Sequence, residues 1–108
     1  RAVFVYTTFP SLVEAEAAAR VIVGQKLAAC VNILPGMISQ YWCNGAVERG
    51  EEVVMIIKTR ASLAARVSAA VKEAHSYSTP AILVIPIESV EQGYLDWLMG
   101  ETAPAATG

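Results

Sequence analysis

The segment "CVNILPGMISQYWCNGAVERGEEVVMIIKTR", residues 30–60, decides how this 108-residue chain folds. Asn44-Gly45 divides it into two extended runs, and this dipeptide is a strong signal for a two-residue β-hairpin turn. The incoming arm is predicted over 29–43 and the outgoing arm over 46–59. Both arms exceed the usual strand length of about 5–6 residues. Pro35-Gly36 predicts a bend or a bulge inside the first arm.

A strand and a helix are predicted before the hairpin. Residues 2–9, "AVFVYTTF", alternate as a strand does. The segment 11–30, "SLVEAEAAARVIVGQKLAAC", is rich in alanine and favours a helix. Ser11 and Glu14 have the spacing of a capping box, which places the start of this helix.

A second helix, a strand and a terminal helix are predicted after the hairpin. Residues 61–75 have helical periodicity, and "PAILVIPIE" at 80–88 reads as a strand in which Pro86 favours an edge position. The final helix is predicted over 89–100. Ser89 and Gln92 form a possible second capping box there, and Gly100 is typical of a helix end.

The predicted order is β-α-β-β-α-β with an additional C-terminal helix. This order is typical of an α+β protein with the ferredoxin-like split βαβ sandwich, in which two helices cover one face of a four-stranded antiparallel sheet. We expect residues 1–100 to form a single domain with a long central hairpin. The remaining residues, 101–108, are predicted to form a flexible tail.

Two of the predicted strands are apolar on both faces. The runs "VVMIIK" (53–58) and "AILVIPI" (81–87) do not alternate, as strands of a sheet with one wet face should. Two helices can cover only one face, so a second copy of the chain is the simplest cover for the other. The hairpin tip would also leave Tyr41 and Trp42 in water. The sequence therefore predicts an oligomer.

Composition limits the classes of partner and compartment. Hydrophobic residues make up 55% of the chain, charged residues 17%, and the net charge is −2 without a basic cluster. Nucleic acid is therefore not expected as a partner. No apolar run reaches the roughly 18 residues of a membrane span. Cys30 and Cys43 lie too far apart along one extended stretch to pair, and free cysteines indicate a cytoplasmic protein.

Five segments occur in an order and spacing that resemble the CutA family of divalent-cation tolerance proteins. They are "KLAACVNILPG" (26–36), "YW" (41–42), "EEVVMIIKT" (51–59), H-x-Y-x-x-P (75–80) and "YLDWL" (94–98). The resemblance implies a ferredoxin-like homotrimer, similar in architecture to the PII signalling proteins. It also implies an association with copper and other divalent cations.

The segment around the single histidine departs from the family pattern. The family usually reads close to "HPYEVPE", whereas this chain reads "HSYSTPA" at 75–81. Two typical carboxylates are thereby replaced by Ser78 and Ala81. Copper-binding members can also supply a cysteine and a second histidine at positions that correspond here to Thr7 and Ala74. The ligand set implied by the resemblance is thus reduced to His75.

Two roles remain open for His75. As a metal ligand it would need donors from a neighbouring chain, because its sequence neighbours offer only hydroxyl groups, which are poor ligands for Cu(II) or Zn(II). As a structural residue it would end the second helix, where an imidazole interacts favourably with the helix dipole. Cys43, beside the hairpin turn, is a possible additional thiol ligand.

Other candidate groups favour structural roles. The glutamates at 48, 51 and 52 are interpreted as a solvated strand start rather than a cation site, since cation binding would need their side chains to converge. Aromatic residues at the hairpin tip and on the final helix are interpreted as trimer-interface anchors: Tyr41, Trp42, Tyr94 and Trp97. No phosphate loop, G-x-S-x-G or H-E-x-x-H motif is present.

The sequence therefore predicts a homotrimer that binds divalent metal ions, Cu(II) or Zn(II), without catalysis, membrane attachment or nucleic-acid binding. Two alternatives remain. One is a PII-like signalling trimer that binds a small molecule between subunits, and the other is a protein-binding scaffold.

Overall fold

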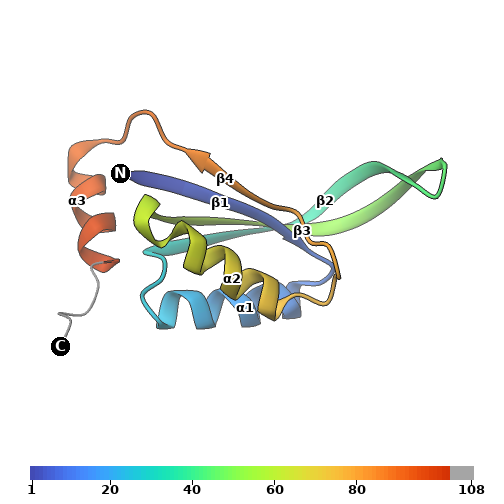
Figure 1. The fold of residues 1–108 in the computed structure, drawn as a ribbon, viewed down its shortest axis with the longest axis horizontal. Helices are drawn as coiled ribbons and strands as arrows, with labels where there is room; N and C mark the ends of the chain where they lie inside the picture. The colour runs from blue at the N-terminus through green and yellow to red at the C-terminus, as the bar shows by residue number, and fades with distance from the viewer. Residues whose placement is uncertain (103–108) are drawn as a thin grey trace.

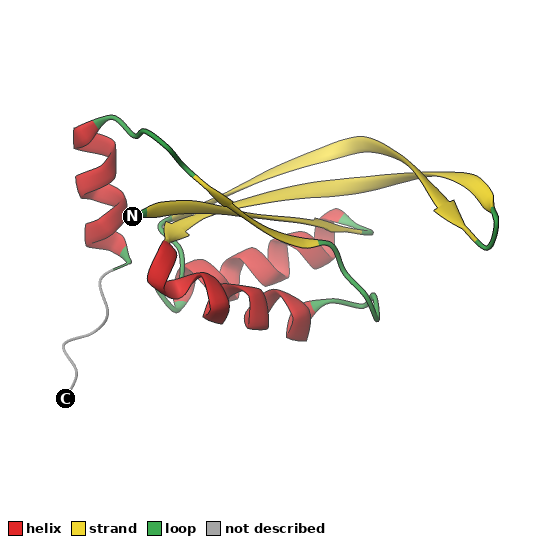
Figure 2. Cartoon of the chain, turned by 45° about the horizontal axis from the view of Figure 1, so that its top comes forward, coloured by secondary structure: helices red, strands yellow, loops and turns green. Residues whose placement is uncertain are grey.

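A four-stranded antiparallel sheet lies at the centre of the computed structural model, which describes residues 1–102. Its strands, in the spatial order β2-β3-β1-β4, are β2 (Cys30–Cys43), β3 (Ala46–Arg60), β1 (Ala2–Phe9) and β4 (Ile82–Pro86). The helices α1 (Leu12–Gly24) and α2 (Ala64–Ala74) lie side by side on one face of the sheet, and α3 (Gln92–Glu101) stands at one end (Figures 1 and 2). This arrangement confirms the predicted ferredoxin-like fold, and β4 is an edge strand as Pro86 indicated.

The hairpin forms as Asn44-Gly45 predicts. Asn44 and Gly45 have φ angles of 51° and 79°, and two positive values are what a type I′ turn requires. Pairing starts beside the turn, where Cys43 faces Ala46. The outer part of the hairpin projects beyond the helices and the other strands, at the right of Figure 1. This projection accounts for much of the molecule's 49 Å length.

A β-bulge at Pro35-Gly36 changes which side chains share a face. Leu34 pairs with Val54, whereas Met37 pairs with Glu52, so β2 carries one extra residue at this point. Gly36 adopts a φ of +82° there, a conformation that suits glycine. Because side chains alternate along a strand, one extra residue reverses the alternation for the outer half of β2.

The core lies between the sheet and the two helices. Alternate residues of β1 and β3 face the helices, and α1 contributes alanines that let it approach the sheet closely. The main buried apolar side chains are Val5, Phe9, Ala15, Ala18, Ile22, Met55, Ile57, Val67 and Val71. The side chain of Thr59 is also buried and donates a hydrogen bond of 2.6 Å to the carbonyl of Leu27.

The first helix is shorter than the 11–30 segment that its composition favours. Ser11 caps its start by accepting the N–H of Glu14. Lys26 has a φ of +60°, and two hydrogen bonds run backwards over the helix end, from Lys26 N to Val23 O and from Leu27 N to Ile22 O, both 3.0 Å. This pair of bonds is a Schellman motif, and it ends the helix. Because glycine is the usual residue at this left-handed position, the lysine found there gives no sequence signal that the helix ends.

The last helix begins at a different cap from the predicted one. The Ser89–Gln92 box does not form; instead the carboxylate of Glu91 accepts the N–H groups of Gly93 and Tyr94 at 2.9 and 3.0 Å. These backbone hydrogen bonds lower the pKa of Glu91. A carboxylate also interacts favourably with the positive end of the helix dipole.

The end of α3 passes the predicted stop at Gly100. Glu101 is the last helical residue and Thr102 is fully buried, so these two residues belong to the domain rather than the tail. The Arg60 guanidinium donates to the Met99 carbonyl and to Thr102 Oγ1. These bonds fasten the helix end to β3. The remainder of the predicted tail, 103–108, lies outside the described residues.

The sheet face opposite α1 and α2 carries an apolar surface, here called the open face. Its side chains alternate with the core-facing ones, and it spans all four strands: Phe4, Tyr6, Leu34, Val54, Ile56, Leu83 and Ile85. Leu34, Leu83 and Ile85 are each about half exposed. The helix α3 contacts β1 and β3 at one end of this face, near Phe4. No other element within residues 1–102 covers the rest of the open face. The two-sided apolar runs in the sequence predicted such an uncovered face for a single chain.

Candidate functional site

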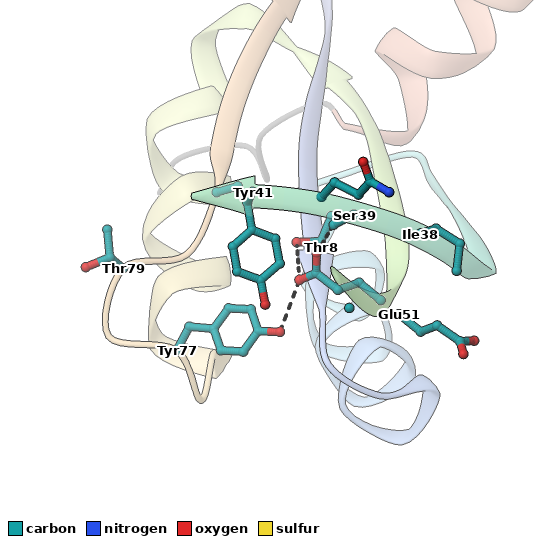
Figure 3. Close-up of a pocket in the computed structure, with 11 residues that line it drawn as sticks. Thr8, Ile38, Ser39, Tyr41, Glu51, Tyr77 and Thr79 are labelled. Atoms are coloured by element: carbon teal, nitrogen blue, oxygen red, sulfur yellow. Dashed lines mark hydrogen bonds between the residues drawn. The ribbon is translucent and has the colours of Figure 1, made fainter. Parts of the chain in front are cut away.

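The carboxylate of Glu52 is the centre of the most elaborate polar arrangement in residues 1–102. Its Oε2 accepts hydrogen bonds from Thr8 Oγ1 at 3.1 Å and Tyr77 Oη at 3.0 Å. Its Oε1 accepts from Ser39 Oγ at 2.8 Å. Three hydroxyl groups from three different segments therefore hold one carboxylate in a single orientation (Figure 3).

The bulge in β2 explains why these groups meet. Val53 lies opposite the bulge in β3 and points into the core, so its neighbour Glu52 points to the other side of the sheet. Beyond Pro35-Gly36, Ser39 and Tyr41 share that side with Glu52. If the pairing of Leu34 with Val54 continued along the same sequence without a bulge, Ile38 and Gln40 would take their places. The bulge thus brings a hydroxyl and an aromatic ring to the carboxylate.

The loop after α2 supplies Tyr77, and His75 fixes that loop. The His75 ring stacks on Phe9, with centroids 4.2 Å apart and planes 12° apart. Its Nε2 lies 2.6 Å from the Thr8 carbonyl, and the N–H of Tyr77 donates to its Nδ1 at 3.3 Å. Because a carbonyl can only accept and an N–H can only donate, His75 here is neutral with its proton on Nε2.

A second contact holds the same loop from α1. The side chain of Glu14 accepts the N–H of Ser76 at 2.8 Å. Glu14 therefore does not complete the capping box with Ser11 but connects the start of α1 to the end of α2. His75 therefore fixes the loop 75–77 to β1, and Glu14 fixes it to α1. These two contacts position Tyr77 for its hydrogen bond to Glu52.

An open cleft of about 770 Å³ lies over this network. The hairpin and the loop after α2 line it, and the rings of Tyr41 and Tyr77 point towards one another from these two elements (Figure 3). Apolar contact surface comes from Ile38 and Ala81. The charged residues among those that line it are both acidic, Glu51 and Glu52. The cleft therefore combines aromatic walls with negative charge.

The surroundings of Tyr77 are uniformly unfavourable to its ionisation. Burial, the hydrogen bond to Glu52 and the negative charge of Glu52 raise the pKa of Tyr77 to about 12. Weaker effects of the same sign come from Tyr41 and Glu14. Tyr77 therefore remains a proton donor to Glu52 throughout the physiological pH range.

The structure does not bring the predicted metal donors together. Cys43 is exposed at the hairpin tip, whereas His75 lies against β1 in the body of the molecule. Glu51 points away from the group around Tyr77 in Figure 3. Within residues 1–102, no three His, Cys, Asp or Glu side chains are grouped as a metal ion would require.

The predicted interface aromatics are all exposed in the single chain. Trp42 is 77% exposed at the hairpin tip, and Tyr41 and Trp97 are each about half exposed. Tyr41 also lines the cleft. Tyr94 lies beside Trp97 on α3, with ring centroids 5.5 Å apart, and its hydroxyl accepts a long hydrogen bond from Lys58 Nζ at 3.4 Å.

The Glu52 network was missed from sequence, where Glu52 was interpreted only as part of a solvated acidic cluster. Thr8, Ser39 and Tyr77 lie 44, 13 and 25 positions away from it. The one local signal was Pro35-Gly36, whose extra residue changes the facing of Ser39. The dipeptide predicts a bulge, but it does not predict which residue of β3 lies near Ser39.

Together, these features define a small α+β protein of the ferredoxin-like class, with an extended hairpin and a polar cleft at its base. The family described as CutA1 divalent ion tolerance protein matches residues 3–101. The chain belongs to this family. None of the helices in residues 1–102 has the length and apolar character needed to cross a membrane.

Individual relatives show the same likeness. The chain is 48% identical over 95 residues to the divalent-cation tolerance protein CutA of Archaeoglobus fulgidus, an alignment that covers 88% of this chain and 92% of the relative. It is 41% identical over 100 residues to the chloroplastic protein CutA 1 of Oryza sativa, covering 93% of this chain and 56% of the relative. The solved structure of the periplasmic Archaeoglobus fulgidus CutA superimposes with a TM-score of 0.91 at 45% identity, covering 94% and 99% of the two chains.

Proposed function

We propose that the protein acts in divalent-cation tolerance as a homotrimer. The observation that carries this proposal is the open face, an apolar surface across all four strands that α1 and α2 leave uncovered. Covering a half-exposed leucine or isoleucine contributes roughly 1 kcal/mol. Leu34, Leu83 and Ile85 therefore favour contact with another copy of the chain. The exposed Tyr41, Trp42 and Trp97 supply further anchors for that contact.

Light scattering on the full chain tests the assembly. We expect a mass of three chains at micromolar concentration. Leu83→Lys places a charge on the open face and should lower the mass, whereas Val13→Lys, at a 79% exposed position on α1, should leave it unchanged. A monomeric wild type, or equal behaviour of the two variants, would refute the proposal.

A binding role is favoured over a catalytic one. A nucleophile needs a base within hydrogen-bond reach. The two thiols lie on β2, with Cys43 at the tip, whereas both His75 nitrogens are engaged by backbone groups of other segments. The free thiols, with Cys43 exposed, also support a cytoplasmic location, where cysteines stay reduced.

Within this proposal, His75 is the nitrogen donor for Cu(II) or Zn(II), and a neighbouring chain supplies the remaining donors. Cys43 is a further thiol candidate, because the projecting hairpin carries it away from its own chain's body. Metal binding at His75 would require the ring to release the Thr8 carbonyl or the Tyr77 N–H. A competent site must therefore offset the loss of at least one hydrogen bond.

Calorimetric titration with CuCl₂ and ZnCl₂ tests the metal role, with the N-terminal amine acetylated because it binds copper itself. We expect stoichiometric binding to wild type and weaker binding to His75→Gln, whose amide retains a donor for the Thr8 carbonyl. Cys43→Ser tests the thiol separately. Identical isotherms for wild type and both variants would show that neither residue is a ligand.

A second candidate function, binding of a small molecule, is favoured by the cleft at Glu52. Its volume is in the range of ligand sites, and its polar groups converge on one oriented carboxylate. The PII-like alternative predicted a ligand between subunits, whereas this cleft is lined by residues of a single chain. The chemistry of the cleft limits what that molecule can be.

A further inference from the structure

We infer that the cleft at Glu52 binds a small organic cation with an ammonium or guanidinium group. This inference deepens the second candidate function, since it names the class of ligand for that cleft. It does not use His75 as a ligand; His75 only holds the loop that carries Tyr77. Three features of the cleft favour such a ligand: its charge, the free hydrogen-bonding capacity of Glu52 and the aromatic rings that line it.

The charge of the cleft selects a cation. Glu51 and Glu52 are the charged residues that line it, and neither a lysine nor an arginine is among its lining residues. An anionic ligand would therefore meet two carboxylates and no counter-charge. A cation gains the attraction of Glu52, with a weaker contribution from Glu51, whose side chain points away from the group around Tyr77, and the partly enclosed surface makes this attraction stronger than in bulk water.

The hydrogen bonds of Glu52 leave room for an N–H donor but not for a metal ion. A carboxylate has about four acceptor positions. Tyr77 and Thr8 use two on Oε2, and Ser39 uses one on Oε1, so one position on Oε1 remains. Divalent metal ions require several converging donors, whereas one N–H of an ammonium or guanidinium needs a single acceptor.

The three hydroxyl groups also prepare Glu52 for binding. They hold the carboxylate before the ligand arrives, so little side-chain entropy is lost on binding. The rings of Tyr41 and Tyr77 flank the same space (Figure 3). Aromatic faces attract cations, and organic cations more weakly hydrated than metal ions gain most from this contact. Ala81 and the carbon atoms of the two rings offer apolar surface for the carbon skeleton of the ligand.

Calorimetry and amide chemical shifts of the full chain test the inference with matched probes. The cationic probes are phenethylammonium chloride and agmatine, and 2-phenylethanol is the neutral analogue of the first. We expect saturable binding of a cationic probe, with shifts at Ser39, Tyr41 and Tyr77. The alcohol should bind about tenfold more weakly, because its hydroxyl can donate to Glu52 but carries no positive charge.

Two variants locate the site. Glu52→Gln keeps the size and an acceptor but removes the charge, and should weaken binding of the cations by about tenfold or more. Glu16→Gln removes the same charge at an exposed position on α1, away from the cleft, and should leave binding unchanged. If Glu52→Gln fails to fold, Ala81→Lys, at an exposed position, places a competing ammonium in the cleft and should also block binding.

Three results would overturn the inference. They are no saturation of the wild type by either cation up to about 10 mM, equal binding of the alcohol, and unchanged binding in a folded Glu52→Gln. None of them affects the trimer mass or the copper and zinc isotherms. Failure of this inference is therefore distinguishable from failure of the assembly or of the metal role.

Discussion

Replacement of His75 tests whether this residue is part of the scaffold. His75→Ala removes the stacking on Phe9 at 4.2 Å and the hydrogen bond from Nε2 to the Thr8 carbonyl at 2.6 Å. A neutral hydrogen bond contributes about 0.5–1.5 kcal/mol, and an aromatic pair contributes a similar amount, about 0.5–1.5 kcal/mol. His75 is half-buried, so water can replace part of the hydrogen bond and part of the stacking contact. We therefore expect the free energy of unfolding to fall by about 1–2 kcal/mol.

His75→Gln separates the two contributions. The glutamine side chain has an N–H that can reach the Thr8 carbonyl, but it has no ring to stack on Phe9. We expect about half of the loss seen in His75→Ala. The free energy of unfolding is measured by urea denaturation with far-UV circular dichroism, at one fixed protomer concentration, because assembly adds to apparent stability.

Two outcomes would refute this account of His75. The first is a free energy of unfolding for His75→Ala within about 0.3 kcal/mol of wild type, since this is inside the usual range for a surface substitution. The second is a His75→Gln variant as unstable as His75→Ala, which would show that the hydrogen bond to Thr8 contributes nothing. Comparison with the metal titration then shows whether the residue serves the scaffold, the ligand or both.

Three further predictions concern the cleft, a helix end and the core. Because the pKa of Tyr77 is raised from 10.0 to about 12, the stability that the protonated phenol contributes is complete below about pH 10 and is lost as the pH rises towards 12. The stability advantage of wild type over Tyr77→Phe should therefore shrink across this interval, and a constant difference would contradict the role of Glu52. Lys26→Gly should raise the free energy of unfolding by about 0.5–1 kcal/mol, since glycine adopts a φ of +60° without strain; a loss in urea denaturation would contradict the Schellman account. Thr59→Val should lower it by about 1–3 kcal/mol, because the Leu27 carbonyl loses a buried partner at 2.6 Å, and an unchanged thermal unfolding curve would show that this bond is dispensable.

The fold was predictable because its main signals are local. Asn44-Gly45 determines the turn and therefore the register of the hairpin, and Ser11 marks the start of α1. Where two local signals competed, prediction failed. Ser89 and Glu91 can both cap α3, and the carboxylate of Glu91 reaches two N–H groups. The end of α1 was missed because Lys26 adopts a conformation that its residue type does not favour.

The candidate site was harder to predict because its contacts are long-range. Nothing near Glu52 in sequence indicates that Thr8, Ser39 and Tyr77 surround it, since these contacts depend on the sheet order and on the loop that His75 holds. The resemblance directed attention to His75 as a metal ligand. The structure adds that its imidazole connects β1 to the loop carrying Tyr77.

The bulge at Pro35-Gly36 also allows the hairpin to tolerate a single deletion at this point. Removing Gly36 would make the pairing regular from Leu34 to Met37 and would leave Ser39 and Tyr41 on the face of Glu52, because the turn fixes their register. The outer half of β2 would therefore keep its side chains in place, and only the local bend and twist of the bulge would be lost. Among homologous sequences, a stretch that is one residue shorter here should preserve the facing of the cleft residues between the bulge and the turn.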